Sequence, residues 1–266
     1  MKLYISADIE GVAGVTSWSE TDLNNRESTS FIMQMEKEVL KICECAKQKG
    51  FNEIVVKDAH ETGRNIDFNV LPDYVRLIRG WSGHPLAMLE GIDESYDAIA
   101  LVGFHSAASR ETSPLSHTMH VRKVNYIKIN GKIASEFLIF YYAGLNMGIP
   151  TIFVSGDEGL CSEIKEVNNG IVTVSTKTGF GRATMNIHPN QVINELENKF
   201  NSIEFEKAKY LKPLPNKFTV EVAFKNPATA YWASFYPGVV EQKDNKILFE
   251  SYNYMDVLKL FSFVIS

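Results

Sequence analysis

Two carboxylates close the first apolar run of the chain, in the segment SADIEGVAG at residues 6–14. Asp8 and Glu10 are two residues apart, so in an extended chain both side chains point to the same side. Such a pair is compatible with metal binding, but it is also the ordinary polar end of a strand at which a turn starts. Residues elsewhere in the sequence decide between these two interpretations.

Acids or histidines also close three later apolar runs. These runs, with the residues that follow them, are 53–57 before Asp58-Ala59-His60, 98–103 before Phe104-His105, and 150–155 before Gly156-Asp157-Glu158. Short β-branched runs without alternation are typical of strands buried on both faces. The carboxyl ends of parallel strands meet at one edge of an α/β sheet, where ligands bind. The sequence therefore predicts a polar active site at that edge.

Aspartate, glutamate and histidine without cysteine form the ligand set of a catalytic zinc or a related divalent ion. With Glu136 added, five side chains suffice for two ions if Asp8 bridges them. We expect Asp8, Glu10 and His105 on one ion. We expect Asp8, His60 and Glu136 on the other. Because a water bridging two such ions becomes a strong nucleophile while the ions clamp a carbonyl or phosphoryl oxygen, we expect a hydrolase with two zinc ions.

One further histidine is a candidate for proton transfer. His117, in PLSHTMH at residues 114–120, follows the apolar run 98–103 and is not needed as a metal ligand. We expect it to transfer protons or to stabilise developing charge, and His120 is the alternative for this role. Asp58, two residues before His60, is expected to orient the side chain of that histidine without binding the metal itself.

Several of these residues also have structural explanations. An acid at position 136, in the first turn of a helix, is favoured by the helix dipole alone. His105 is equally compatible with a half-buried, hydrogen-bonded histidine. Cys161 lies near the predicted pocket, but without a paired base it is a lesser candidate for a nucleophile. The combination of such residues at the ends of several strands favours the active site.

A strand–helix–strand pattern positions the first of these residues. Between the runs 3–7 and 53–57, five apolar residues recur on one helical face, and Gly50 then ends the helix. The five residues are Phe31, Met35, Val39, Ile42 and Ala46. This spacing is typical of a βαβ unit and predicts a mainly parallel sheet covered by helices.

The remainder of the chain is expected to differ in character. Residues 123–132 alternate and then meet the hairpin signal Asn130-Gly131, and Ser135 is placed to cap a helix over 137–147. A helix over 186–200 is followed by strands at 218–224 and 246–249.

These elements predict a three-layer α/β fold with a mainly parallel or mixed central sheet. We expect residues 1–165 to form the metal-binding catalytic domain, and residues 166–266 to form a smaller, β-rich C-terminal portion.

Composition and net charge indicate the cellular compartment of the chain and the classes of partner that it can bind. The chain has 266 residues, of which 45% are hydrophobic and 22% charged, with a net charge of −5, as in ordinary globular proteins. This charge gives no reason to expect nucleic acid or an anionic membrane as a partner. Three cysteines are too few for a disulfide framework, and Asp8 interrupts any signal-peptide apolar region. We expect a cytoplasmic protein without a membrane span.

The motifs resemble those of one known family. Ser6–Gly11 is similar to the SxDxEG signature of the DppA-type D-aminopeptidases, which are zinc peptidases. The similarity continues in family order over about 160 residues. The matching segments are Asp58–His60, Gly103–His105, Ser116–Met119, Ser135-Glu136 and Ser155–Glu158.

This resemblance implies a ligand set, a catalytic residue and an assembly. The positions of Asp8, Glu10, His60, His105 and Glu136 bind two zinc ions in that family, with the first aspartate shared. The position of His117 is catalytic. The resemblance also implies a homo-oligomer, a decamer of two stacked pentameric rings that admits short peptides.

We therefore expect a dizinc aminopeptidase that removes the N-terminal residue of short peptides, of the D-alanine type. A dimetal amidase or phosphoesterase acting on another small substrate is the first alternative. A non-catalytic, peptide-binding oligomer is the second alternative.

Overall fold

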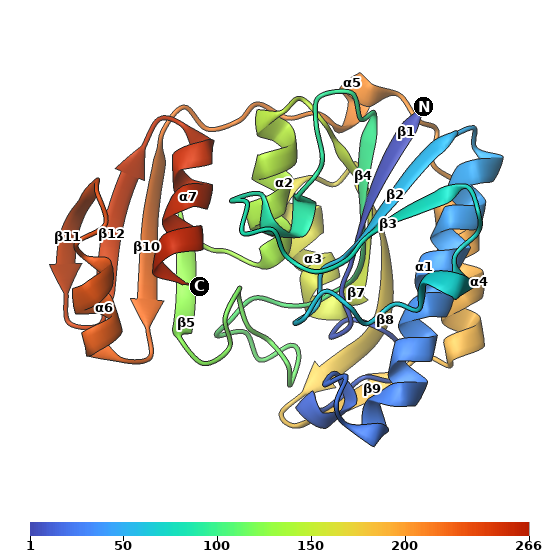
Figure 1. Ribbon diagram of the computed structural model, residues 1–266, viewed down its shortest axis with the longest axis horizontal. Helices are drawn as coiled ribbons and strands as arrows, with labels where there is room; N and C mark the ends of the chain where they lie inside the picture. Colours follow the sequence, from blue (N-terminus) through green and yellow to red (C-terminus); the bar gives the residue numbers. More distant parts are fainter. Residues whose placement is uncertain (266) are drawn as a thin grey trace.

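Two β-sheets lie side by side in the computed structural model, which describes residues 1–265 (Figure 1). The larger sheet has the order β3-β2-β1-β4-β7-β8-β9 and is parallel except for β9, which pairs antiparallel with β8. Its strands are β1 (Lys2–Ala7), β2 (Glu53–Asp58), β3 (Val75–Ile78), β4 (Ala98–Phe104), β7 (Thr151–Asp157), β8 (Val172–Phe180) and β9 (Ala183–Asn186).

Helices cover both faces of this larger sheet. Helices α1 (Thr29–Gln48) and α4 (Pro189–Asn201) pack together on one face, and α2 (Glu136–Asn146) and α3 (Glu158–Val167) lie on the other (Figure 1). Successive residues of β1 alternate between two cores, so Leu3 faces α1 while Tyr4 faces the other side. The three-layer α/β prediction is confirmed, and burial on both faces explains why these strands are continuously apolar.

The smaller sheet is antiparallel, with the order β11-β12-β10-β5-β6. Its strands and helices are β5 (Val124–Ile129), β6 (Lys132–Ile133), β10 (Phe218–Phe224), α6 (Pro227–Ala233), β11 (Val239–Lys243), β12 (Lys246–Ser251) and α7 (Tyr254–Val264). The hairpin predicted at Asn130-Gly131 joins β5 to β6. Both turn residues have the positive φ, 51° and 80°, that a two-residue hairpin turn requires.

The two sheets exchange elements across the boundary that we expected near residue 165. Strands β8 and β9 extend the larger sheet after this point, whereas β5 and β6, which precede it, complete the smaller sheet. The boundary near residue 165 thus does not coincide with the division between the two sheets. The division into 1–165 and 166–266 stays a prediction about folding units.

Short helices lie in the connections between the main elements. Helix α5 (Lys207–Tyr210) lies between α4 and β10, and single 3₁₀ turns are formed by Trp18–Glu20, Arg26–Ser28, Phe68–Val70 and Ala87–Leu89. Within residues 1–265, no helix has both the length and the apolarity required to cross a membrane.

Four strands of the larger sheet were predicted from the sequence, and they are direct neighbours in the order β2-β1-β4-β7. Their carboxyl ends therefore meet at one edge, as expected for parallel strands. Strands β3, β8 and β9 were not predicted. The short β3 is an edge strand in which only Val75 is buried, so it lacks the apolar run that identifies the others.

Candidate metal centre

Backbone packing brings the ends of β1 and β4 into direct contact. The amide of Gly11 donates to the carbonyl of Gly103 at 2.7 Å. A Cβ at position 11 would lie 1.7 Å from the carbonyl oxygen of Phe104, and one at position 103, where φ is +73°, would lie 2.2 Å from that of Asp8. Only glycine fits at both positions, so these glycines allow Asp8 and His105 to share one site.

Asp8, Glu10 and His60 form one cluster. Nδ1 of His60 lies 3.3 Å from Oδ1 of Asp8 and 3.0 Å from Oε2 of Glu10. All three side chains are buried. Nε2 of His60 lies 3.0 Å from the carbonyl oxygen of Thr21, which is an acceptor. Nε2 therefore donates to this carbonyl, and Nδ1 is the nitrogen that faces the carboxylates and is available as a metal ligand.

His105, Glu136 and His117 form a second cluster that adjoins the first. Nε2 of His105 lies 3.5 Å from Oε2 of Glu136 and 3.5 Å from Oδ2 of Asp8. Nδ1 of His105 is bonded to the carbonyl oxygen of Ser106 at 2.9 Å, so Nε2 is left to face the two acids. Asp8 thus directs one carboxylate oxygen at His60 and the other at His105.

The five predicted ligands converge, but their grouping differs from the one that we expected. Glu10 lies with His60 rather than with His105. Glu136 lies with His105 rather than with His60. The reason is that His60 follows β2 on one side of β1, while His105 and Glu136 come from β4 and α2 on the other. The position of Asp8 between the two groups agrees with a shared ligand.

The donor atoms fit divalent cations of the zinc type. The ligand atoms of each cluster lie within 4.8 Å of one another. Nε2 of His105 is buried without a hydrogen-bond partner among the described residues, and Oε2 of Glu10, also buried, faces Nδ1 of His60 at 3.0 Å. Unpaired buried polar atoms are costly, and a cation is a partner that carboxylates and neutral imidazoles share. The three carboxylates and two imidazoles of the five predicted ligands match the nitrogen and oxygen ligands of catalytic zinc.

The charges of the site shift the pKa values of its members in opposite directions. Burial and the adjacent charge of Glu10 raise the pKa of Asp8 well above its usual range. Burial would also raise the pKa of Glu10, but His60 outweighs it and holds the value well below the usual range.

In the second cluster, burial and the contact between opposite charges again shift the pKa values in opposite directions. Burial would raise the pKa of Glu136, but the contact with His105 outweighs it and lowers the value. Burial would likewise lower the pKa of His105, and the contact with Glu136 overcomes it and raises the value to about 10. The two clusters thus stabilise positive charge among their carboxylates.

His117 differs from the other two histidines of the site. Its ring stacks on that of His105 at 4.2 Å and meets the edge of Trp18 at 5.3 Å. Nδ1 is bonded to the carbonyl oxygen of Leu115 at 3.0 Å, so Nε2 faces Glu136, 3.7 Å from Oε1. Burial and the neighbouring His105 lower the pKa of His117. Nε2 is thus a free acceptor, and it also lies close enough to the second cluster to serve as a further nitrogen ligand.

Lys177 and Glu38 hold the segment that carries Glu10, and sequence reasoning missed both. Nζ of Lys177, on β8, donates to the carbonyls of residues 10, 12 and 15 at 2.5, 3.1 and 2.5 Å. Burial lowers the pKa of Lys177 to about 8. Oε1 of Glu38, on α1, accepts from the amide of Ala13 at 3.1 Å. No local pattern marks these residues, because their partners are backbone atoms distant in sequence.

Two aspartates at strand ends support the site without facing it. Asp58 supports His60 through Asn65, and no hydrogen bond or ion pair within residues 1–265 joins Asp58 to the imidazole ring. Its carboxylate accepts from the side chain of Asn65, which also donates to the carbonyl of His60 at 2.8 Å. Asp157, at the end of β7, accepts from the amide of Ser106 at 2.7 Å and caps α3. Both acids therefore fix the loops that carry the histidines.

Two other candidates from the sequence have local roles. His120 lines the cavity beside the clusters, where its Nδ1 accepts from the amide of Arg122 at 3.2 Å. Cys161 is buried, and burial raises the pKa of its thiol to about 12. A thiol with such a pKa carries almost no thiolate near neutral pH, so the structure gives no support to Cys161 as a nucleophile.

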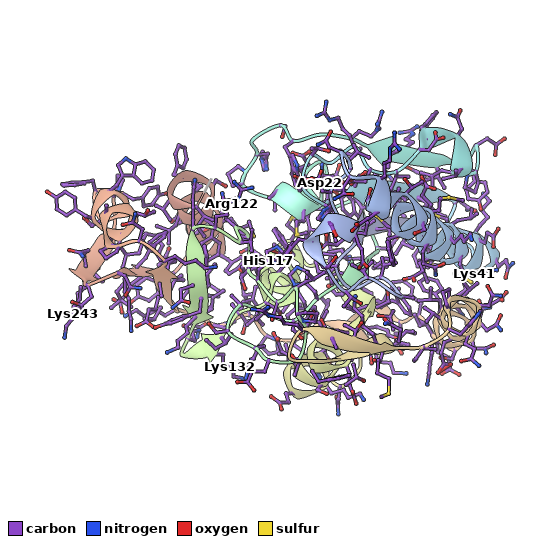
Figure 2. All side chains as sticks on the ribbon, turned by 90° about the horizontal axis from the view of Figure 1, so that it is seen from below. Asp22, Lys41, His117, Arg122, Lys132 and Lys243 are labelled. Carbon is purple, nitrogen blue, oxygen red and sulfur yellow. The ribbon has the colours of Figure 1, made fainter. Side chains whose placement is uncertain are left out.

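A cavity of about 800 Å³ opens beside both clusters, and we call it the metal cavity. His117, which lines it, lies in the middle part of the molecule (Figure 2). Trp18 and Trp81, each 41% exposed, supply large apolar walls. Trp81 is held by a hydrogen bond to the carbonyl of Glu61 at 2.7 Å and by Nζ of Lys57, 3.9 Å from the centre of its ring. The metal cavity has the size and the mixed lining typical of small-molecule sites.

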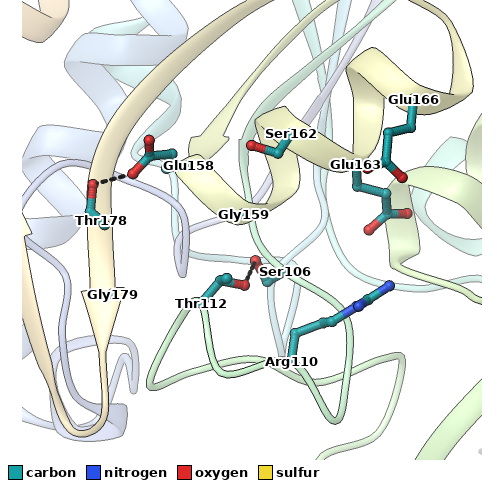
Figure 3. A pocket seen from close by; sticks show the side chains of 10 residues that line it. All are labelled: Ser106, Arg110, Thr112, Glu158, Gly159, Ser162, Glu163, Glu166, Thr178 and Gly179. Carbon is teal, nitrogen blue, oxygen red and sulfur yellow. Dashed lines mark hydrogen bonds between the residues drawn. The ribbon is translucent and has the colours of Figure 1, made fainter.

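A second cavity, of about 350 Å³, lies at the start of α3, and we call it the α3 cavity (Figure 3). Several of its polar side chains are paired with one another. Thr112 donates to Oγ of Ser106 at 2.8 Å, and Thr178 donates to Glu158 at 2.6 Å (Figure 3). Burial raises the pKa of Glu163, and no histidine is among the lining residues in the described part of the chain. The acids that follow β7 therefore do not join the metal cavity.

Comparisons with known proteins agree with this fold. The structure is similar to that of the Zn-dependent D-aminopeptidase DppA from Bacillus subtilis, a self-compartmentalizing protease. The TM-score is 0.91 at 24% identity, over 100% of this chain and 97% of that one. A D-aminopeptidase of Bacillus subtilis strain 168 is 26% identical over 240 residues, which are 90% of this chain and 86% of the relative. The family profile of the M55 peptidases, described as D-aminopeptidase, matches residues 1–263, and the chain therefore belongs to the D-aminopeptidase family M55.

Proposed function

We propose that the chain is a dizinc aminopeptidase that removes the N-terminal residue of short peptides, with D-alanine peptides as its substrates. Membership of the D-aminopeptidase family supports this activity, and the zinc dependence of the Bacillus subtilis relative supports the metal. The observation that carries the proposal is the pair of adjoining acid–histidine clusters that meet at Asp8.

The proposed ligands form two sets that share one aspartate. The first set is Asp8, Glu10 and His60, and the second is Asp8, His105 and Glu136. Backbone carbonyls fix the proton of each histidine on the nitrogen that faces away from the acids. When bound, two zinc ions supply Lewis acidity, which polarises a scissile carbonyl and lowers the pKa of water.

His117 is the proposed proton carrier. Its Nδ1 is held by the carbonyl of Leu115, so Nε2 is free to accept a proton from an attacking water and to donate it to the leaving amine. Stacking on His105 and the edge contact with Trp18 fix the ring plane, which keeps Nε2 aimed at the clusters. This orientation supports a proton-transfer role without requiring His117 as a nucleophile.

The proposed function is tested by metal analysis followed by a substrate panel. We expect the purified protein to bind two zinc ions per chain. We expect it to hydrolyse D-Ala-D-Ala faster than L-Ala-L-Ala and to leave an aryl phosphate intact. Faster turnover of the phosphate would favour a dimetal phosphoesterase. Peptide binding without turnover after zinc loading would favour a binding protein.

His117→Gln separates its two candidate roles. A proton carrier predicts that the variant keeps two zinc ions per chain and loses about 10²- to 10⁴-fold in kcat. A metal ligand predicts that the variant loses zinc from one site, which mass spectrometry under native conditions detects. His120→Gln is the matched control, because His120 lines the same cavity outside the clusters. We expect this control to keep both zinc and activity.

We also propose that the chain assembles into a homo-oligomer, specifically a decamer of two stacked pentameric rings. The self-compartmentalizing description of the Bacillus subtilis relative supports an assembly with an inner chamber. The smaller sheet and its helices expose large aromatic side chains, a feature typical of interaction surfaces. These side chains are Tyr231, Trp232, Phe235, Tyr252 and Phe263.

Sedimentation velocity tests this assembly. We expect a single species of about ten chains for the wild type, the number that the family resemblance implies, and a smaller species for Trp232→Glu, which places a charge in the exposed aromatic surface. A monomer in both cases would contradict the proposal.

Finally, we propose a cytoplasmic location. The three cysteines are all buried and unpaired within residues 1–265, which agrees with a reducing compartment.

A further inference from the structure

Arg122 supplies a free positive charge to the wall of the metal cavity. It is the one arginine or lysine that lines this cavity in the described part of the chain. The residue is exposed, and no hydrogen bond or ion pair engages its guanidinium within residues 1–265. Lys57, which approaches the same wall behind Trp81, is buried and paired with Glu90 at 3.1 Å. Of these two cations, only Arg122 is available to a ligand.

The main chain around Arg122 is fixed relative to the proposed metal ligands. The amide of Met119 donates to Oε1 of Glu136 at 2.6 Å, which ties this loop to the second cluster. From the other side, Nζ of Lys225 donates to the carbonyl of Val121 at 2.7 Å. Arg122 is therefore carried on an anchored turn beside the clusters, while its side chain stays free to contact a ligand in the metal cavity.

The other charged groups of the metal cavity would repel a carboxylate ligand that has no cationic partner. The remaining charged side chains that line it, apart from histidines, are acidic: Asp8, Glu10, Asp22, Glu61 and Glu136. A carboxylate entering such a cavity loses water and meets like charge, which is costly without a cationic partner. The planar guanidinium of arginine binds a carboxylate through two parallel hydrogen bonds. In the view of Figure 2, Arg122 lies on the side of His117 toward the smaller sheet, and Asp22 lies on the opposite side.

A short peptide carries charges that match this arrangement. Its amino group is attracted to the acidic side of the metal cavity, and its C-terminal carboxylate needs the cation. We infer that Arg122 binds the C-terminal carboxylate of the substrate, so that free dipeptides and tripeptides are the preferred substrate class. This inference rests on the proposed aminopeptidase function. Each added residue extends a peptide by about 3.4 Å, so only a peptide of a few residues can have both its ends in the metal cavity.

The test compares D-Ala-D-Ala with its C-terminal amide in the zinc-loaded enzyme. We expect wild type to prefer the free acid by about 10- to 100-fold in kcat/KM, since a hydrogen-bonded ion pair is removed in the amide. In Arg122→Gln this preference should fall to within about threefold, mainly through KM, while hydrolysis of the amide stays near wild type. Arg122→Lys should restore part of the preference.

Arg110→Gln is the matched control, because Arg110 lies on the same connection between β4 and β5 but lines the α3 cavity. It should keep the preference for the free acid. Equal losses on acid and amide in Arg122→Gln would overturn the inference, and so would a wild type that does not discriminate between them. Wild type that cleaves neither substrate would overturn the proposed function itself, which is a different outcome from cleavage of both at equal rates.

Calorimetry separates binding from turnover. In a His117→Gln background, which slows hydrolysis, Arg122→Gln should weaken binding of D-Ala-D-Ala by about 10-fold or more and leave binding of the amide unchanged. A loss that is the same for both ligands would assign Arg122 a structural role only.

Discussion

The metal cavity and the α3 cavity both lie where strands of the larger sheet end, and both are lined by three or more acidic side chains. They differ in what the acids meet. In the metal cavity, buried carboxylates face histidine nitrogens that lack other partners among the described residues. In the α3 cavity, polar groups satisfy one another, as Thr178 and Glu158 illustrate. A count of acids therefore does not identify a metal site, whereas buried carboxylates that face histidine nitrogens do.

The pKa shifts express the same difference. Burial works against ionisation of Glu10, yet contact with His60 holds its pKa low, whereas burial raises the pKa of Glu163. The first carboxylate is therefore an anion ready to bind a cation. The second gains from a proton or from the hydroxyl of Ser135, which donates to it at 2.7 Å.

Asp8→Asn is the change with the largest expected effect, because Asp8 faces both clusters and the amide removes the charge that they share. We expect the zinc content to fall below two ions per chain and kcat/KM to fall by about 10³-fold or more. Asp22→Asn, on the rim of the same cavity, is the control and should keep both ions. Full activity of Asp8→Asn with two ions bound would remove the basis of the comparison.

Glu38 extends the comparison to a buried acid with no histidine. Its pKa is raised to about 7 by burial, against two hydrogen bonds and Lys177, which lower it. A raised carboxyl pKa means that the native state binds the proton more tightly than the unfolded chain does. The stability that protonated Glu38 contributes is fully present below pH 4.5 and is lost as the pH rises through about 7.

Glu38→Gln should therefore flatten this pH dependence. Relative to the variant, the wild type should lose about 2 to 3 kcal/mol in its free energy of unfolding between about pH 5 and about pH 8. Urea unfolding of both proteins at the two pH values measures this difference. An offset between wild type and variant that is the same at both pH values would show that Glu38 does not titrate in this range.

Lys177→Met tests whether the support of the metal cavity matters as much as its ligands. The variant leaves the carbonyls of residues 10, 12 and 15 without their shared donor, so the segment that carries Glu10 loses its anchor. We expect zinc affinity to fall by about 10- to 100-fold, as for outer groups of other metal sites, when measured by competition with a chelator. Lys165→Met, an exposed change on α3, should leave affinity unchanged. Wild-type affinity in Lys177→Met would assign the lysine to folding alone.

The sequence predicted the parts of this site that repeat along the chain, and it missed the parts that depend on crossings between strands. Apolar runs identified β1, β2, β4 and β7, and the ends of the first three led to Asp8, His60 and His105. The grouping of the ligands was not predictable, because it depends on β2 and β4 lying on opposite sides of β1. Lys177 was equally hidden, since β8 reaches the site only by pairing with β7.

The smallest expected effect belongs to the α3 cavity, and it decides whether the comparison holds. Glu158 and Glu166 are acids that line it and belong to neither cluster. The double variant Glu158→Gln, Glu166→Gln removes two negative charges from the α3 cavity while keeping the side-chain shapes. We expect zinc content to stay at two ions per chain and kcat/KM to stay within about threefold, because exposed charges are screened by water and salt.

Isothermal titration with zinc measures the number of sites in this double variant directly. Two sites with wild-type affinity are expected, because the two exposed acids face solvent rather than a histidine. Loss of a zinc site would show that solvated acids bind the metal as well as buried, unpaired ones do, and the distinction between the two cavities would then fail.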